Sequence, residues 1–104
     1  MTKFWVDDVR PSPSGYKHIH SVDEFIFLFE HNPKLFDNLG IKEFEIDLAH
    51  DSGEYYKYGG DYINILNYLE HFAKEYSIIV KFHTMNPVGL KNMQLIVDRN
   101  INNN

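Results

Sequence analysis

Three short polar groups in this sequence carry residue types that can do chemistry, and each group directly follows an apolar stretch. The groups are Asp7-Asp8, His50-Asp51 and His83-Thr84. Adjacent carboxylates at the end of a buried strand repel each other, so such a pair persists where a positive charge lies beside it. Histidines close to carboxylates can exchange protons near neutral pH. These residue types predict a site that binds a phosphate and a cation.

Asp7 and Asp8 are candidate ligands of Mg²⁺ or Mn²⁺, because hard cations prefer carboxylate oxygens. Asp51 would complete a three-carboxylate site with them if the three strand ends converge. Asp47 lies deeper on the same face of its strand as Asp51, since side chains alternate along a strand. The alternative is that one acid of the Asp7-Asp8 pair caps the following turn and the other is solvated.

His50 and His83 are the candidate catalytic residues, because two histidines facing one phosphate can act as acid and base. The alternative is that each is structural, with His50 bonded to a backbone carbonyl. Arg10 is a candidate phosphate ligand, since a guanidinium can bind phosphate through two hydrogen bonds. The alternative is that Arg10 is an ordinary surface arginine before a proline and binds no ligand.

A helix start follows the last of the three groups. Asn86 is placed to cap a helix and Pro87 to occupy its first position. The free amides and the dipole at such a start attract an anion, so Asn86 is a second candidate ligand residue. Gly89 would let the ligand approach this start closely.

Composition limits the kind of protein this is. The chain has 104 residues, enough for one domain with one core, and no cysteine, which rules out disulfides, thiolate zinc sites and cysteine nucleophiles. The net charge of -5 argues against extended binding to a nucleic-acid backbone but not against binding a nucleic-acid end. No apolar run approaches the roughly 20 residues of a membrane span. We expect a soluble cytoplasmic protein that does not contact a membrane. The sequence does not predict its oligomeric state.

The elements that must position these residues alternate along the chain. Strands are predicted at residues 3–6, 16–20, 44–49 and 77–82, and helices follow the predicted N-caps Ser21, Asp61 and Asn86. The run Ile78-Ile79-Val80 predicts that the last strand is buried on both faces. This order predicts a single α/β domain over residues 1–104, with a parallel sheet in the order 2-1-3-4, helices on both faces, and a frayed tail at 98–104. Ligands of such sheets bind beyond the carboxyl ends of the strands, where all three polar groups fall.

Four segments together resemble the cyclic-phosphate processing receiver domains, which are shortened relatives of response-regulator receivers. The segments are Asp7-Asp8-Val9-Arg10-Pro11, His50-Asp51-Ser52-Gly53, Gly59-Gly60-Asp61-Tyr62 and residues 83–93. The resemblance runs from Lys3 to about Val97. It implies a small three-layer, flavodoxin-like domain that lacks the last receiver strand.

The resemblance also implies roles for particular residues. Asp7 and Asp8 match the acidic pair that holds Mg²⁺ in receivers, and Thr84 falls near their conserved hydroxyl. The family usually has Asp-His-Asp after the third strand, but Ala49 stands at the first of these positions, which aligns with the phosphoacceptor of receivers. Alanine cannot form an acyl phosphate, so phosphorelay signalling is not expected. The receiver lysine that follows the last strand has no counterpart.

The predicted function is a cation-assisted phosphoesterase that acts on a cyclic phosphate or on a phosphorylated end of a nucleotide or RNA, as in RNA repair. The partner would then be a small phosphorylated ligand or a nucleic-acid end. The alternative is a non-catalytic receiver-like module that binds a phosphorylated ligand or a protein partner without phosphorelay activity.

Overall fold

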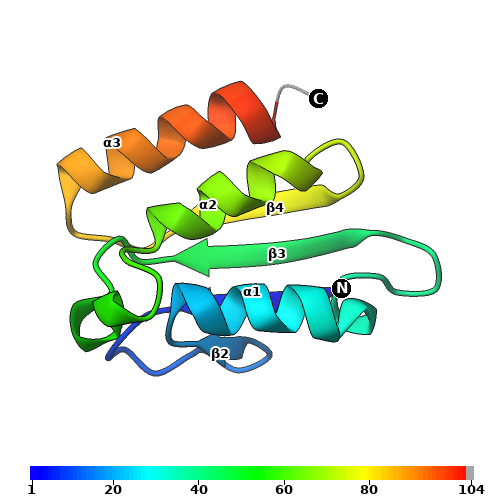
Figure 1. The fold of residues 1–104 in the computed structure, drawn as a ribbon, viewed down its shortest axis with the longest axis horizontal. Helices are drawn as coiled ribbons and strands as arrows, with labels where there is room; N and C mark the ends of the chain where they lie inside the picture. The colour runs from blue at the N-terminus through cyan, green and yellow to red at the C-terminus, as the bar shows by residue number, and fades with distance from the viewer. Residues whose placement is uncertain (103–104) are drawn as a thin grey trace.

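A four-stranded parallel sheet is the framework of the fold (Figure 1). The computed structural model describes residues 1–102. The strands are β1 (Thr2–Val6), β2 (Lys17–Ile19), β3 (Glu43–Leu48) and β4 (Ser77–Phe82). Their order is β2-β1-β3-β4 and all three pairings are parallel, which confirms the predicted order.

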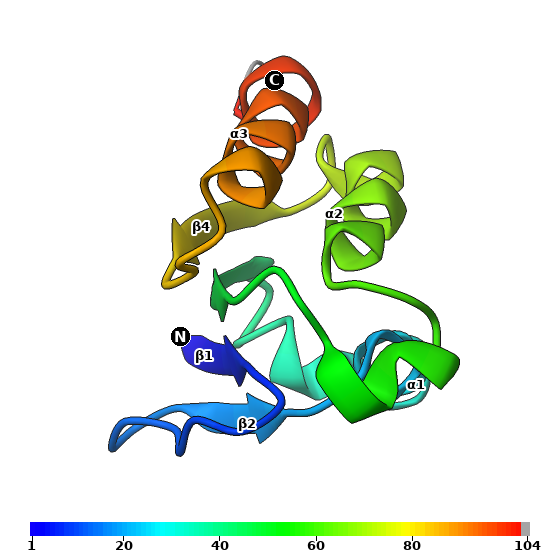
Figure 2. The same cartoon turned by 90° about the vertical axis from the view of Figure 1, so that its left-hand side faces the viewer.

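The helices α1 (Val22–His31), α2 (Ile63–Leu69) and α3 (Pro87–Ile96) all lie on the same side of this sheet (Figure 2). The prediction of helices on both faces, and hence of three layers, is wrong. With right-handed crossovers, only the β1–β2 connection runs in the direction that would place a helix on the second face. That connection contains Pro11, Pro13 and Gly15, and it is a loop rather than a helix. The domain therefore has two layers.

The core lies between the helices and one face of the sheet. The inward strand residues Phe4, Val6, Phe44, Ile46 and Leu48 are fully buried. They pack with Phe25 and Phe29 of α1, Ile65, Leu66 and Leu69 of α2, and Met93 of α3. The alternate strand residues point to the open face, where Trp5, Asp47 and Lys81 share one register row.

Strand β4 is an edge strand, because it pairs only with β3. Ile78 faces the core and is 8% exposed, whereas its neighbour Ile79 faces outward and is 36% exposed. The prediction that this strand is buried on both faces is therefore wrong. Its β-branched run reflects strand propensity rather than burial on two sides.

Two of the three predicted N-caps are confirmed. The Ser21 hydroxyl accepts the amide of Glu24 at 3.0 Å, and the Asn86 side chain accepts the amide of Gly89 at 2.9 Å. Asp61 does not cap α2, whose N-cap residue is Tyr62. Instead, one oxygen of Asp61 accepts the backbone amide and the hydroxyl of Ser52. That interaction fixes the loop after β3 against the start of α2.

The chain stays helical beyond α3, in a π-helical turn over Val97–Ile101. Ile101 is 7% exposed and belongs to the core. The prediction of a frayed tail is therefore wrong for residues 98–101. The remaining tail residues 103–104 lie outside the described part of the chain. Within residues 1–102, no helix has the length and apolar character that crossing a membrane requires.

Candidate functional site

A cavity of about 300 Å³ opens at the carboxyl ends of β1, β3 and β4. All three polar groups contribute to it. Its lining residues are Asp7, Asp8, Val9, Arg10, Ala49, His50, Asp51, His83, Thr84, Met85 and Asn86. The parallel strands end at one edge of the sheet, and this brings together residues far apart in the sequence. Of the predicted site residues, only Gly89 is outside the lining.

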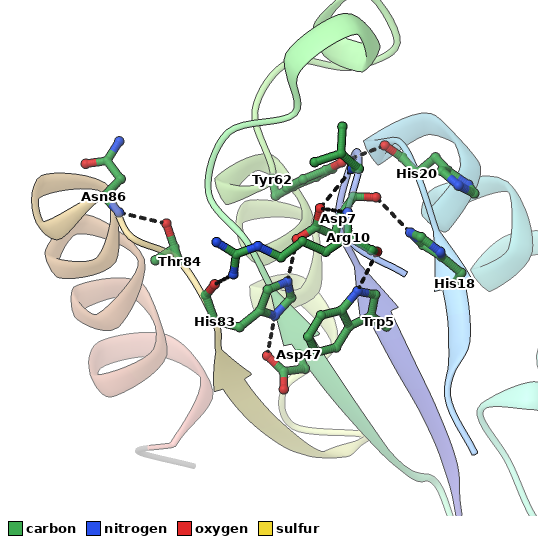
Figure 3. Close-up of polar contacts among 11 residues, drawn as sticks. Trp5, Asp7, Arg10, His18, His20, Asp47, Tyr62, His83, Thr84 and Asn86 are labelled. Carbon is green, nitrogen blue, oxygen red and sulfur yellow. Dashed lines mark hydrogen bonds and ion pairs between the residues drawn. The ribbon is translucent and has the colours of Figure 1, made fainter. Parts of the chain in front are cut away.

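Asp7 is held by the turn that follows β1 (Figure 3). Its Oδ1 accepts the backbone amides of Val9 and Arg10 at 2.9 and 2.8 Å, and its Oδ2 lies 2.8 Å from Nε2 of His83. Burial by itself would raise the pKa of Asp7, but these hydrogen bonds outweigh it, and the pKa lies below its ordinary value. Asp7 is therefore an ionised and fully engaged carboxylate.

The His83 ring lies between two carboxylates (Figure 3). Its Nε2 faces Asp7, and its Nδ1 lies 2.6 Å from Oδ1 of Asp47. One face of the ring stacks on Trp5, with centroids 3.7 Å apart and planes 5° from parallel. Both ring nitrogens are thus occupied by protein groups. This arrangement gives His83 no free nitrogen with which to exchange a proton with a ligand.

Arg10 and Trp5 brace this arrangement from outside. The Trp5 indole donates to the carbonyl of Arg10 at 3.1 Å, and Nη1 of Arg10 donates to the carbonyl of His83 at 3.0 Å. The rest of the guanidinium has no contact among the described hydrogen bonds and ion pairs of residues 1–102. Arg10 is one of the lining residues of the cavity, where its guanidinium can meet an anion.

His50 is held differently. Its Nδ1 lies 2.9 Å from Oδ1 of Asp51, and no hydrogen-bond partner of its Nε2 is found in residues 1–102. The ring packs directly on Gly89, where a Cβ atom would lie only 2.4 Å from the ring carbons. Gly89 therefore makes room for His50, rather than for a ligand as the sequence suggested. An imidazole oriented by a carboxylate, with its other nitrogen open, is suited to proton transfer.

Thr84 and Asn86 lie just before α3 and line the cavity, and the Arg10 side chain reaches toward this part of the chain (Figure 3). The Thr84 hydroxyl accepts the amide of Asn86 at 3.1 Å and keeps its own proton to donate. The Asn86 oxygen caps the helix, while its Nδ2 lies 3.4 Å from Nδ1 of His50. The Thr84 hydroxyl and the Asn86 side-chain amide can donate to an anion, whereas the Gly89 amide of the first helical turn is taken by the Asn86 cap.

The residues predicted to hold a metal do not form one ligand set. Asp7 has both oxygens engaged, and Asp8, beside Gly53, has no hydrogen-bond partner in the described chain. Within residues 1–102, the converging group is His50, Asp51 and Asp61, with ligand atoms within 4.8 Å of one another. Asp7, Asp8 and Asp51 are not found converging in this way among the described residues, and a Mg²⁺ or Mn²⁺ site made of these three carboxylates stays a prediction.

Sequence reasoning missed Trp5 and the direct contact of Asp47 with His83. Strand alternation contained part of the signal, because Trp5 and Asp7 are two residues apart and so share a face of β1. The register then places Trp5 opposite Asp47 of β3. His83 follows β4 on the same face, so these residues meet on the side of the sheet that lacks helices.

Two further groups support the end of β1. His18 of β2 contacts the carbonyl of Asp7 through Nε2 at 2.9 Å, and the fully buried Tyr62 donates its hydroxyl to the carbonyl of His20 at 2.7 Å. Burial, with Asp8 and Asp7 nearby, raises the pKa of Tyr62 well above its ordinary value. Tyr62 is therefore a neutral structural donor beneath the acidic pair.

Comparison with known proteins agrees with this picture. The family model of the cyclic-phosphate processing receiver domain matches residues 2–99. Neither the curated proteins nor the solved structures that were compared give a significant match. The family match covers nearly the whole chain and includes every residue of the cavity. This small parallel α/β protein belongs to the family of cyclic-phosphate processing receiver domains.

Proposed function

We propose that this protein binds a phosphorylated ligand in the cavity and hydrolyses a cyclic phosphate ester, with His50 as the group that moves protons. One observation carries the proposal. His50 lines the cavity, its Nδ1 contacts Asp51 and its ring packs on Gly89, and no hydrogen-bond partner of its Nε2 is found among residues 1–102. The family description, which names cyclic-phosphate processing, supports the choice of ligand.

The anion would be bound by three groups that line the cavity. These are the guanidinium of Arg10, the hydroxyl of Thr84 and the side-chain amide of Asn86. The carboxylates of the cavity oppose an anion, but Asp7 and Asp51 are each in contact with a histidine ring. Asp8 has no hydrogen-bond or ion-pair partner among the described residues.

The proposed reaction is the hydrolysis of one phosphoester bond. A water oxygen forms a bond to phosphorus, and the bond from phosphorus to one sugar oxygen breaks. His50 Nε2 takes the proton that the water loses and returns it to the leaving oxygen, so the product is a phosphomonoester with a free hydroxyl. Asp51 keeps the ring oriented and stabilises its charged form.

Turnover of 2′,3′-cyclic nucleotides, followed by ³¹P NMR, tests the proposal. Separate reactions with EDTA, Mg²⁺ and Mn²⁺ test the predicted cofactor. His50→Gln should lower the rate about 10²–10⁴-fold, while His71→Gln, a change of an exposed histidine far from the cavity, should leave it unchanged. Equal rates for the two variants, or no hydrolysis of any cyclic nucleotide, would rule out the catalytic role.

A non-catalytic binding module is the second candidate, and His83 favours it. Both nitrogens of His83 are engaged, so the expected pair of acid and base is reduced to one histidine. Ala49 also leaves no phosphoacceptor at the usual position, which argues against phosphorelay signalling. Binding of a cyclic nucleotide by calorimetry, without turnover under any metal condition, would identify the protein as such a module.

A further inference from the structure

We propose that Val9 and Met85 bind a nucleobase, so that the ligand is held by its phosphate inside the cavity and by its base at the rim. This inference rests on the proposed function, because it assumes that a phosphate binds beside Arg10 and His50. It assigns residues to a part of the ligand that takes no part in the reaction.

Val9 and Met85 are apolar residues that line a polar cavity, yet their side chains are 79% and 84% exposed. Apart from Ala49, the other lining residues are polar or charged. Neither Val9 nor Met85 belongs to the hydrophobic core found within residues 1–102, so packing of the fold does not account for them. One exposed apolar side chain needs no explanation, but two at one cavity offer apolar contact to a ligand whose polar end lies inside.

The two side chains come to the cavity from different strands. Val9 follows β1 and Met85 follows β4, and β3, which leads to His50, lies between these strands in the sheet. The two strand ends are therefore separated by two strand steps, about 9–10 Å. Nη1 of Arg10 donates to the carbonyl of His83 at 3.0 Å, so the loop after β1 and the end of β4 meet across the end of β3 (Figure 3). Side chains from two loops at this separation can contact the two faces of one flat ring.

A nucleobase has the chemistry that this rim requires. The cavity of about 300 Å³ is at the small end of ligand sites, so it can take the phosphate and leave the rest of the ligand to the rim. A base is flat, has two apolar faces and is joined to a cyclic phosphate by a single sugar ring. The thioether of methionine contacts aromatic rings favourably. The net charge of -5 disfavours the other common apolar phosphate ligand, a lipid of an anionic membrane.

Calorimetric titration with two ligands tests the inference. The ligands are adenosine 2′,3′-cyclic phosphate and 1-O-methylribose 2′,3′-cyclic phosphate, which has the same sugar and phosphate but no base. Full-length His50→Gln protein serves as the parent, so that hydrolysis does not consume the ligand. The adenosine compound should bind the parent about tenfold or more tightly than the compound without a base. Adding Val9→Ser and Met85→Ser together should remove this advantage, and the exposure of both side chains means that this double variant should fold.

The matched control is Leu39→Ser, which removes an exposed apolar side chain in the turn before β3, at the other end of the sheet, and should keep the advantage. Equal affinity of the parent for the two ligands would overturn the inference and leave the phosphate site intact. An advantage that the double variant keeps would overturn it as well. No binding of either ligand, to the parent or to the wild-type protein, would overturn the proposed function and the inference together.

A trinucleotide that ends in adenosine 2′,3′-cyclic phosphate distinguishes the two sources of this ligand chemistry. Affinity equal to that of the mononucleotide, or higher, would identify an RNA end as the ligand, and affinity lower by about tenfold would identify a free nucleotide. Either result agrees with the inference. For whichever of the two binds more tightly, the double variant of Val9 and Met85 should weaken binding about tenfold, and unchanged binding would overturn the inference.

Discussion

Asp7 links the stability of the protein to pH. Its pKa is lowered in the folded state, so its contribution to the free energy of unfolding is complete above its unfolded pKa of about 3.9 and is lost as pH falls through the folded pKa. Asp7→Asn should therefore cost about 3 kcal/mol at neutral pH and progressively less in acid. Urea unfolding of both proteins from neutral to strongly acidic pH measures this. The exposed change Asp23→Asn should instead give a small and nearly constant difference, and a constant difference for Asp7→Asn would contradict the prediction.

Gly89 shows how one residue can reverse an ordinary preference. Alanine in a helix is usually favoured over glycine by about 1 kcal/mol, but a Cβ atom at this position would lie 2.4 Å from the His50 ring. Gly89→Ala should therefore lower the free energy of unfolding, by about 1–3 kcal/mol, and shift the NMR signals of His50. Gln94→Ala, on the exposed side of the same helix, should do neither. A more stable Gly89→Ala variant with unmoved His50 signals would show that the contact is unimportant.

For single residues, the sequence predicted which side chains line one cavity but not which of them form hydrogen bonds with each other. Asp7, His50 and His83 were recognised from their types and from their places after apolar strands, and they do line one cavity. The pairing of His83 with Asp47 depends on the register of β3 with β4 and on the path of the chain after Phe82. Neither follows from residue types. A histidine that ends with both nitrogens engaged looks the same in the sequence as a catalytic one.

At the scale of elements, β4 offers the sharpest test of the observed layers. Ile78 faces the core and Ile79 the open face, although the two are adjacent and identical in type. Ile78→Thr should lower the free energy of unfolding by about 2 kcal/mol, since it removes buried methyl groups and buries a hydroxyl. Ile79→Thr should change it by less than about 0.5 kcal/mol. Similar losses for the two variants, measured by urea unfolding, would mean that the outer face of β4 is covered.

The connection between β1 and β2 explains why the sequence predicted the sheet better than its layers. The strand order and the helices after Ser21 and Asn86 followed from alternation, capping residues and apolar periodicity. The general expectation for alternating strands and helices is a sheet covered on both sides. Yet Pro11, Pro13 and Gly15 had already indicated a loop in the one connection able to cover the second face. Applying the handedness of crossovers to that loop would have predicted two layers.

In the molecule as a whole, no helix covers one face of the sheet. The site therefore lies where this open face meets the edge formed by the carboxyl ends of the strands. Trp5, Asp47 and His83 lie on the open face of the sheet, while His50 and Asn86 lie at the strand ends beside the helices. Asp7 and Arg10 connect the two regions, because they belong to the loop that replaces a helix. The same loop therefore leaves the second face open and supplies the proposed phosphate ligand.

This arrangement predicts uneven stability across the sheet. Strand β3 lies between two neighbouring strands, whereas β2 is an edge strand of only three residues. The Asp7 amide donates a hydrogen bond to the Ile19 carbonyl and so joins β2 to the end of β1. Amide hydrogens of β3 should exchange only through global unfolding, and those of β2 through local opening that also releases the loop carrying Arg10. Hydrogen exchange followed by mass spectrometry should show markedly faster exchange in residues 17–19 than in residues 43–48. A ligand that binds Arg10 should slow the β2 amides selectively, because opening of β2 and binding of the ligand would compete. Equal protection of the two strands without ligand would mean that the loop and the sheet open as one unit.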